Sequence, residues 1–201
     1  MRLAAVLAAL ALSACSRDAP RADAPESEAS ATPGSTAEPI EAEEGSPFAS
    51  RYTALDIDGC DLVDRQVEGE GATWQCEGFN GIQYWVRTGD GRYDVDAGAR
   101  DDGAFETLGA FNDLGDTLEW RLREEKPFAV IFRYRDVTQR SKGRTVLAVE
   151  TIGTNEAPGC RVAQIAGGTP DANARARKLA DERAGSFDCA ADAMVLVGNA
   201  R

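Results

Sequence analysis

The sequence predicts an α+β domain, in which a mainly antiparallel β meander forms a sandwich or an open barrel and carries one C-terminal helix and two disulfides. Asn80-Gly81 and Asp90-Gly91 are dipeptides that favour type I′ hairpin turns, and both lie between alternating segments. Further runs rich in β-branched and aromatic residues follow, before a single well-delimited helical segment near residue 170. Four cysteines are spread over the same region.

The chain begins with a short apolar segment that has the features of a targeting signal. Arg2 supplies a positive charge, and Leu3 to Leu12 is a run of ten Ala, Val and Leu residues, too short to span a bilayer of roughly 30 Å. It ends in Leu12-Ser13-Ala14-Cys15, which resembles the box of bacterial lipoprotein precursors. In that family the cysteine is acylated and becomes the first residue of the mature protein. The resemblance covers residues 1–16 and implies a signal peptide at 1–14 and a palmitate-bearing Cys15.

The residue after the cysteine influences sorting in the same family. Ser16, unlike an aspartate at that place, implies delivery to the outer membrane, with the protein facing the periplasm. The membrane is then a partner through the lipid on Cys15. An ordinary signal peptide followed by an unmodified cysteine is the alternative.

Residues 15–50 are predicted to form a disordered tether. After Cys15 the segment consists mostly of Ala, Pro, Ser, Thr and Glu, so it buries too little apolar surface to offset its ordering entropy. As a flexible coil it would have an r.m.s. span of about 30–35 Å, enough to hold a domain away from the membrane. We therefore place a single folded domain at residues 51–201, which suffice for a full core.

Composition argues against nucleic acid as a partner. Residues 51–201 carry 19 Lys and Arg against 26 Asp and Glu, a net charge of −7. Residues 16–50 carry 2 against 8, a net charge of −6, so the acidity is shared between the two parts. A nucleic-acid-binding domain would need the opposite balance.

The four cysteines after Cys15 are expected to form two disulfides, as an even number in an exported chain indicates. Three pairings are open. Cys60–Cys76 and Cys160–Cys189 are favoured because each closes a compact loop, worth about 3–3.6 kcal/mol in the loop-closure description. The chain has no Cys-x-x-Cys and no histidine, which argues against a zinc site, and we expect no metal and no other cofactor.

Register can be predicted for the two hairpins. The first turn places Cys76 opposite Trp85, and the second places Arg87 opposite Asp94. Period-two alternation then puts Trp74, Cys76 and Trp85 on one face. An indole against a disulfide is more typical of a core than of a sugar-stacking platform, although Trp85 is the residue that would serve as one.

The remaining elements follow from periodicity and turn residues. Residues 98–115 are rich in Gly and Asp and are predicted to be a loop. In the next strand Leu118, Trp120 and Leu122 alternate with polar residues and should face the core. Further strands are predicted at 128–134, 145–152 and 161–165.

One helix is predicted, capped by Thr169 with Pro170 in its first position, and terminated by Gly185. A thin apolar stripe, with Ala176 and Ala180 at its centre, should pack on the sheet. Ion pairs at i,i+4 are expected on the exposed side, namely Asp171/Arg175, Arg177/Asp181 and Lys178/Glu182.

The chain offers few parts for catalysis, and we expect no enzyme. Without histidine, Ser141 and Ser186 of the folded part lack the usual base. The pairs Asp94/Asp96 and Asp101/Asp102 are the candidates for an acid and a base, but neighbouring aspartates usually lie on a solvated edge. The segment 56–61 has the wrong residues at two positions for a calcium loop and is interpreted as a turn before a disulfide.

The strongest candidate for a binding surface is a group of arginines in this acidic domain. Alternation places Arg121, Arg123, Arg133 and Arg135 opposite the apolar faces of neighbouring strands. They would form a cationic patch for an anionic glycan, a lipid headgroup or an acidic protein. The alternative is ion pairing with Glu119, Asp136 and Glu150.

The folded part resembles uncharacterised bacterial envelope proteins with an early Trp-x-Cys hairpin and a helix followed by Phe-x-Cys, here Trp74-Gln-Cys76 and Phe187-Asp-Cys189. The prediction is a membrane-anchored envelope lipoprotein with a non-enzymatic binding or accessory role, whose partner is an envelope protein or peptidoglycan. The first alternative is an inhibitor of a cell-wall hydrolase, because lysozyme-inhibitor lipoproteins are also small, disulfide-bonded and mainly β. The second is a carboxylate-based glycan hydrolase.

Overall fold

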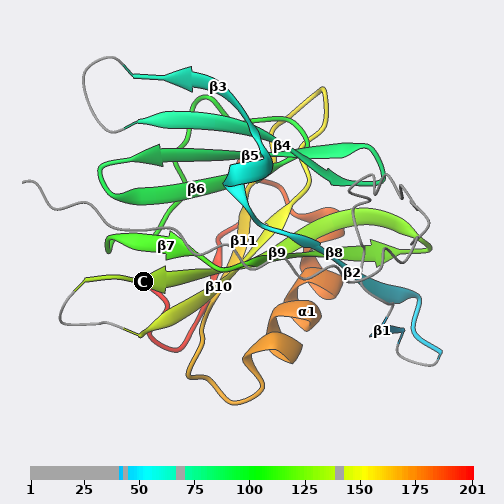
Figure 1. Ribbon diagram of the computed structural model, residues 1–201. Coiled ribbons are helices and arrows are strands. Elements are labelled where there is room, and N and C mark those ends of the chain that lie inside the picture. The colour runs from blue at the N-terminus through cyan, green and yellow to red at the C-terminus, as the bar shows by residue number, and fades with distance from the viewer. Residues whose placement is uncertain (1–40, 43–44, 67–70, 139–142) are drawn as a thin grey trace, which may run out of the picture. The chain divides into compact units, whose positions relative to one another are not determined.

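The computed structural model describes residues 41–42, 45–66, 71–138 and 143–201. The predicted signal peptide, Cys15 and most of the predicted tether lie outside the described residues. The described residues belong to one compact unit, which consists of two β-sheets and one helix (Figure 1). Among them no helix combines the length and the apolar character needed to cross a membrane.

The smaller sheet has four antiparallel strands in sequence order. It consists of β3 (Asp61–Arg65), β4 (Ala72–Phe79), β5 (Ile82–Gly89) and β6 (Arg92–Ala97). Both predicted turns form, with Asn80 and Asp90 at φ 55° and 51°, the left-handed conformation that these residue types tolerate. A short 3-10 helix η1 (Ile57–Gly59) leads into Cys60 at the sheet edge.

The larger sheet has eight strands, in the order β1-β2-β8-β9-β10-β11-β12 with β7 also paired to β9. All pairs are antiparallel except β11 with β12. Its strands are β1 (Glu41–Ala42), β2 (Phe48–Ala54), β7 (Asn112–Leu114), β8 (Thr117–Arg123), β9 (Lys126–Asp136), β10 (Thr145–Thr151), β11 (Arg161–Ala166) and β12 (Val195–Val197).

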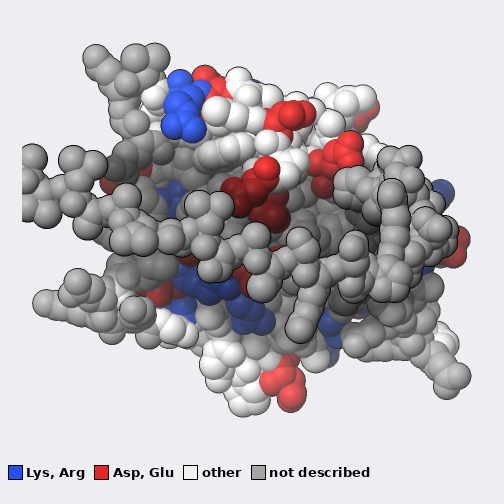
Figure 2. Space-filling model, viewed as in Figure 1, with Lys and Arg blue, Asp and Glu red and all other residues white. Residues whose placement is uncertain are grey.

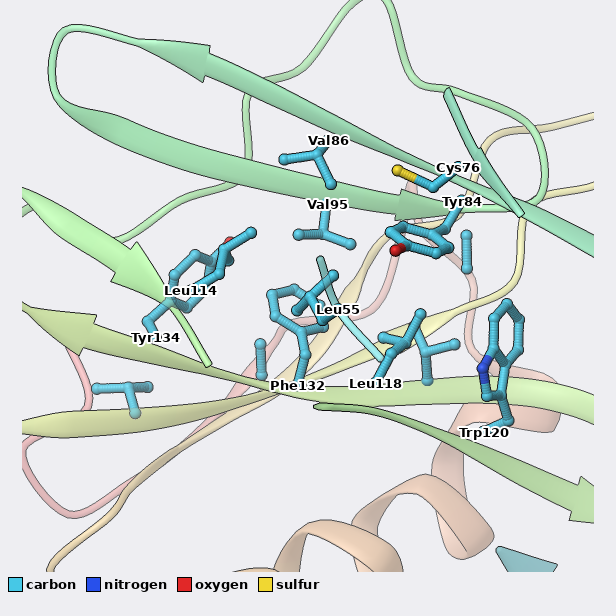
Figure 3. Close-up of a cluster of buried hydrophobic side chains, with 14 of the residues drawn as sticks. Leu55, Cys76, Tyr84, Val86, Val95, Leu114, Leu118, Trp120, Phe132 and Tyr134 are labelled. Carbon is cyan, nitrogen blue, oxygen red and sulfur yellow. The ribbon is translucent and has the colours of Figure 1, made fainter. Parts of the chain in front are cut away.

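The main core lies between the two sheets (Figure 3). Tyr84 and Val86 of the small sheet meet Trp120, Phe132 and Tyr134 of the large one, and all five are at most 2% exposed. The Trp120 indole N–H donates to Thr53 Oγ1 at 2.9 Å, so its polar atom is satisfied inside the core. The architecture is a sandwich, and the described strands do not close into a barrel.

A second core lies between the other face of the large sheet and α1 (Ala172–Arg183). Ala176 and Ala180 are fully buried against Ala129, Ile131 and Ile165. Alanine lets the helix axis approach the sheet closely, as the thin predicted stripe indicated. Figure 1 shows the resulting three layers, with the small sheet above the large one and α1 below it.

Both disulfides are confirmed, as Cys60–Cys76 and Cys160–Cys189. The first joins the start of β3 to β4 within the small sheet. The second joins the residue before β11 to the segment after α1, so it fixes the chain after the helix to the start of β11.

The register of the first hairpin differs from the prediction. Cys76 pairs with Tyr84 and not with Trp85, because a bulge at Glu77 and Gly78 interrupts the ladder before Phe79. Trp85 therefore lies on the outer face of the sheet, on the opposite side from Cys76. The predicted opposition of Arg87 and Asp94 in the second hairpin is confirmed.

Element boundaries differ at three places. The helix begins at Ala172, because Asp171 adopts the left-handed conformation and ends the preceding turn, so Thr169 is not its cap. β2 begins at Phe48, before the predicted domain boundary, since its pairing with β8 extends to Arg123. The predicted loop at 98–115 contains the short strand β7.

Candidate functional site

The alternation predicted for β8 is correct, but its polar face is not solvent-exposed. Leu118, Trp120 and Leu122 point into the main core as expected. On the other face, Glu119 and Arg121 are 8% and 4% exposed, because α1 covers them. The four candidate arginines share one side of the sheet, and each has a different environment there.

Arg121 connects the sheet to the helix. Its Nε and Nη2 donate to the two carboxylate oxygens of Asp181 on α1 at 3.0 and 2.6 Å, a bidentate geometry. Its Nη1 donates to Ser50 Oγ at 2.6 Å, and Ser50 in turn donates to Glu119. Since every side of the guanidinium is occupied, Arg121 is a structural residue and does not belong to a free surface.

Arg177 lies beside this connection and also points toward the sheet. Its Nε donates to Glu119 Oε1 at 2.7 Å and its Nη2 to the Tyr52 hydroxyl at 2.6 Å. The prediction that Arg177 and Asp181 pair on the exposed side of the helix was wrong, because both turn inward to partners on strands. Lys178 and Glu182 do pair on the exposed side, at 3.7 Å.

Arg123 lies at the far end of the strand, near the C-terminus of α1. Its guanidinium is 5.0 Å from the Phe48 ring centre and 5.3 Å from that of Phe128. Its Nη2 donates to the Asp181 carbonyl oxygen at 3.3 Å. The side chain remains exposed, and it does not line the cavity that Arg133 and Arg135 share.

Arg133 is the candidate whose charge is least compensated. It is half-buried on β9, and it donates to two neutral oxygens, Thr145 Oγ1 at 3.1 Å and Asn173 Oδ1 at 2.9 Å. No carboxylate in the described part of the chain forms an ion pair with it. Burial accordingly lowers the pKa of Arg133, with no carboxylate to raise it.

Arg135, two residues further along β9, is exposed and paired. Its Nη2 lies 2.9 Å from Asp116 Oδ1, and that hydrogen bond raises the pKa of Arg135. Asp116 is itself 85% exposed. An exposed pair of this kind contributes little to stability and can exchange its partner readily.

A cavity of about 340 Å³ lies between β9 and the N-terminal half of α1 and brings Arg133, Arg135 and Arg177 together, whereas Arg121 and Arg123 are not among its lining residues. A neighbouring hollow of about 420 Å³ shares Arg133, Asn173 and Arg177 with it. The residues that line the first cavity include Arg133, Arg135, Arg177, Asn173, Tyr52, Glu119 and Asp116. Three guanidinium groups thus converge on one hollow beside two carboxylates.

The candidate acid–base pairs are not arranged around an open cleft. Asp94 and Asp96 are 1% and 8% exposed, and Arg87 forms ion pairs with both. Arg87 also donates to the carbonyl oxygen of Ala104, which holds the following loop over the pair. Burial, followed by the negative charge of Asp94, raises the pKa of Asp96 to about 7.

Asp101 and Asp102 do not form an acid–base pair either. Asp101 Oδ1 accepts hydrogen bonds from the backbone N–H groups of Gly103 and Ala104, at 2.7 and 3.1 Å. Asp102 is exposed and pairs with Arg100 at 2.6 Å. Both residues shape the loop that covers Asp94 and Asp96.

A buried ionic network, which the sequence analysis missed, lies inside the sandwich. Arg161 Nε donates to Glu150 Oε1 at 2.6 Å, and its Nη2 donates to the Tyr134 hydroxyl at 3.1 Å and the Glu106 carbonyl at 2.7 Å. Burial would lower the pKa of Arg161, but Glu150, Tyr134 and Glu106 raise it. The sequence feature that could have indicated this network is Glu150, a glutamate within the apolar run at 145–152.

Trp85 does not form an open platform. Its Nε1 donates to the Gly98 carbonyl at 3.0 Å, and the Arg100 guanidinium lies 5.1 Å from its ring centre. The predicted contact with the disulfide was wrong because of the bulge in β4. An aromatic surface partly covered by arginine is a poor place for a sugar to stack.

Charge on the surface is mixed. Figure 2 shows basic and acidic side chains interspersed on the face that it displays. The lining of the cavity beside Arg133 also carries both signs of charge, with Arg133, Arg135 and Arg177 beside Asp116 and Glu119. Comparisons with protein-family models, with curated proteins and with solved structures find no match to this chain.

Proposed function

We propose that this protein is a lipoprotein of the bacterial envelope, anchored to the outer membrane through Cys15, whose folded domain binds an anionic ligand without catalysing a reaction. The lipoprotein box and Ser16 support the anchor and its location. The two disulfides are in keeping with an oxidising compartment.

The observation that carries the binding proposal is the environment of Arg133. A half-buried guanidinium loses hydration, and here it gains only neutral acceptors in return. An anion in the adjacent cavity would supply the missing counter-charge through charge-assisted hydrogen bonds. Arg135 can turn toward the same anion, because its present partner is an exposed aspartate.

The proposal predicts that Arg133→Gln weakens anion binding about 10–100-fold, the range expected for losing a hydrogen bond to a charged group. Inorganic phosphate is the probe, titrated calorimetrically at low salt. Arg175→Gln is the matched control, because Arg175 lies on α1, which borders the cavity, and donates to the Pro170 carbonyl at 3.0 Å without lining the cavity itself. Equal phosphate affinity in wild type and Arg133→Gln would contradict the proposal.

The proposed anchor predicts that the protein becomes labelled when growing cells are supplied with a fatty-acid analogue. Cys15→Ser should abolish this label and leave an unprocessed precursor, because the peptidase of this pathway acts on the acylated cysteine. Ser16→Thr, which retains the cysteine, should still be labelled. A labelled Cys15→Ser protein would show that the acyl chain is attached elsewhere.

Inhibition of a cell-wall hydrolase is the second candidate, favoured by the edge of the small sheet. Every residue of β3 is exposed, including Asp61 and Asp64, in a domain of net charge −7. Such an edge would attract a basic enzyme at low salt. Inhibition of a basic muramidase that is lost in Asp61→Asn/Asp64→Asn would favour this candidate.

We do not propose a glycan hydrolase, because Asp94 and Asp96 lie beneath Arg87.

A further inference from the structure

A larger groove, of about 770 Å³, lies near the C-terminal end of α1 beside Cys189. Among the described residues that line it, none is charged, although the domain is acidic. Its apolar walls come from the first hairpin, the start of β9, the loop after β10 and the segment after α1, and include Ile82, Phe128, Ile152, Pro158 and Phe187.

Two arginines stand directly against this neutral lining. Arg123 stacks on Phe128, and a Cβ at the lining residue Gly185 would lie only 3.2 Å from its Nη1. The Arg183 guanidinium is 5.7 Å from the Phe187 ring centre. Neither arginine forms an ion pair with any carboxylate of residues 45–66, 71–138 or 143–201. The groove thus combines an apolar surface with two cationic side chains that contact its lining residues.

The shape and chemistry of the lining discriminate between classes of ligand. An acyl chain would require an enclosed apolar tunnel, whereas this groove also exposes Gln83, Thr151, Thr154 and Asn155. These features fit an extended polypeptide that has both apolar side chains and polar main-chain groups.

We infer that the groove is a docking site for an extended segment of a partner protein in which apolar side chains flank an aspartate or glutamate, and that this carboxylate binds Arg123 and Arg183. A guanidinium stacked on an aromatic ring keeps its in-plane N–H groups available for a carboxylate. The site is separate from the cavity at Arg133, since the two share no lining residue.

The test is selection of random dodecapeptides displayed on phage against the full chain carrying Cys15→Ser, which removes the acyl chain as a competitor. Selected peptides should carry Asp or Glu within two positions of Ile, Val, Leu or Phe. Their affinity, measured by fluorescence anisotropy, should fall at least tenfold in Arg123→Gln/Arg183→Gln. The control Arg65→Gln/Arg175→Gln removes the same charge from exposed sites outside the groove and should bind normally.

A second variant tests the groove itself while leaving both arginines in place. Ala157 lines the groove from an exposed position, so Ala157→Trp should obstruct it and reduce peptide affinity by a similar factor. Selection of peptides without acidic residues, equal binding by the arginine variant, or displacement of bound peptide by oleate would each overturn the inference. Phosphate binding at Arg133 should be unchanged in both variants, so failure here is distinguishable from failure of the proposed function.

Discussion

Arg161→Met is expected to lower the free energy of unfolding by about 3–5 kcal/mol, the range for breaking a buried ion pair by removing one partner. Arg161 and Glu150 are 5% and 3% exposed and lie within the sandwich. Without the guanidinium, Glu150 loses its counter-charge, and the Tyr134 hydroxyl loses a hydrogen-bond donor. Urea unfolding at pH 7 with both disulfides intact measures the change.

A double variant separates the cost of an unpaired charge from the loss of packing. In Arg161→Met/Glu150→Met no buried charge is left unpaired, so stability should recover by a substantial part of the loss. Arg65→Met, on the exposed edge strand β3, should be nearly neutral. If the single Arg161 variant unfolded at the same urea concentration as the wild type, the network would not be buried in solution.

Asp96→Asn is expected to make the domain more stable at pH 8 and to reduce the dependence of its stability on pH. Burial is the main cause of the raised pKa of about 7 in the folded state, and the charge of Asp94 adds to it. The unfolded value is near 3.9. Between these values the folded state holds a proton that the unfolded state has lost, so stability falls as pH rises.

The magnitude follows from the width of this window. The contribution of the protonated Asp96 carboxyl to the free energy of unfolding is fully present below about pH 4 and is lost as the pH rises through 7. At 1.36 kcal/mol per pH unit, this loss amounts to as much as about 4 kcal/mol. Urea unfolding at pH 5 and pH 8 should show the difference in the wild type and a smaller one in Asp96→Asn. Burial raises the pKa of Asp94 as well, so some pH dependence of the same sign should persist.

Asp90→Asn is the matched control for this comparison. Asp90 is 77% exposed and occupies the second hairpin turn, where asparagine adopts the same left-handed conformation. Its substitution should leave the slope of stability against pH unchanged. A wild-type protein that becomes more stable from pH 5 to pH 8 would contradict the buried position of Asp96.

The candidate site was only partly predictable. The sequence singled out Arg133 and Arg135, because strand alternation places both on one side of β9. It missed Arg177 and Asn173, whose side chains reach the cavity from a helix that is distant in sequence. It also missed Arg161 and its pairing with Glu150, since a pair formed across neighbouring strands is visible only once their register is known.

The sequence by itself determined the local elements of this protein and their pairing where short-range chemistry decides it. The turn dipeptides, the alternation in β8 and the opposition of Arg87 and Asp94 depend on neighbouring residues or on short loops. For the disulfides the sequence left three pairings open, and the favoured one, with the shorter loops, is confirmed. The tertiary structure decided the rest. A Cβ at Gly78 would lie 2.6 Å from the Trp120 ring, so the bulge that shifts the first hairpin forms where a distant indole needs that space. In the same way, Arg121 is buried only because α1 packs on its face and provides Asp181. Alternation predicts the side on which a residue lies, but whether that side meets water or another layer depends on contacts between segments far apart in the chain.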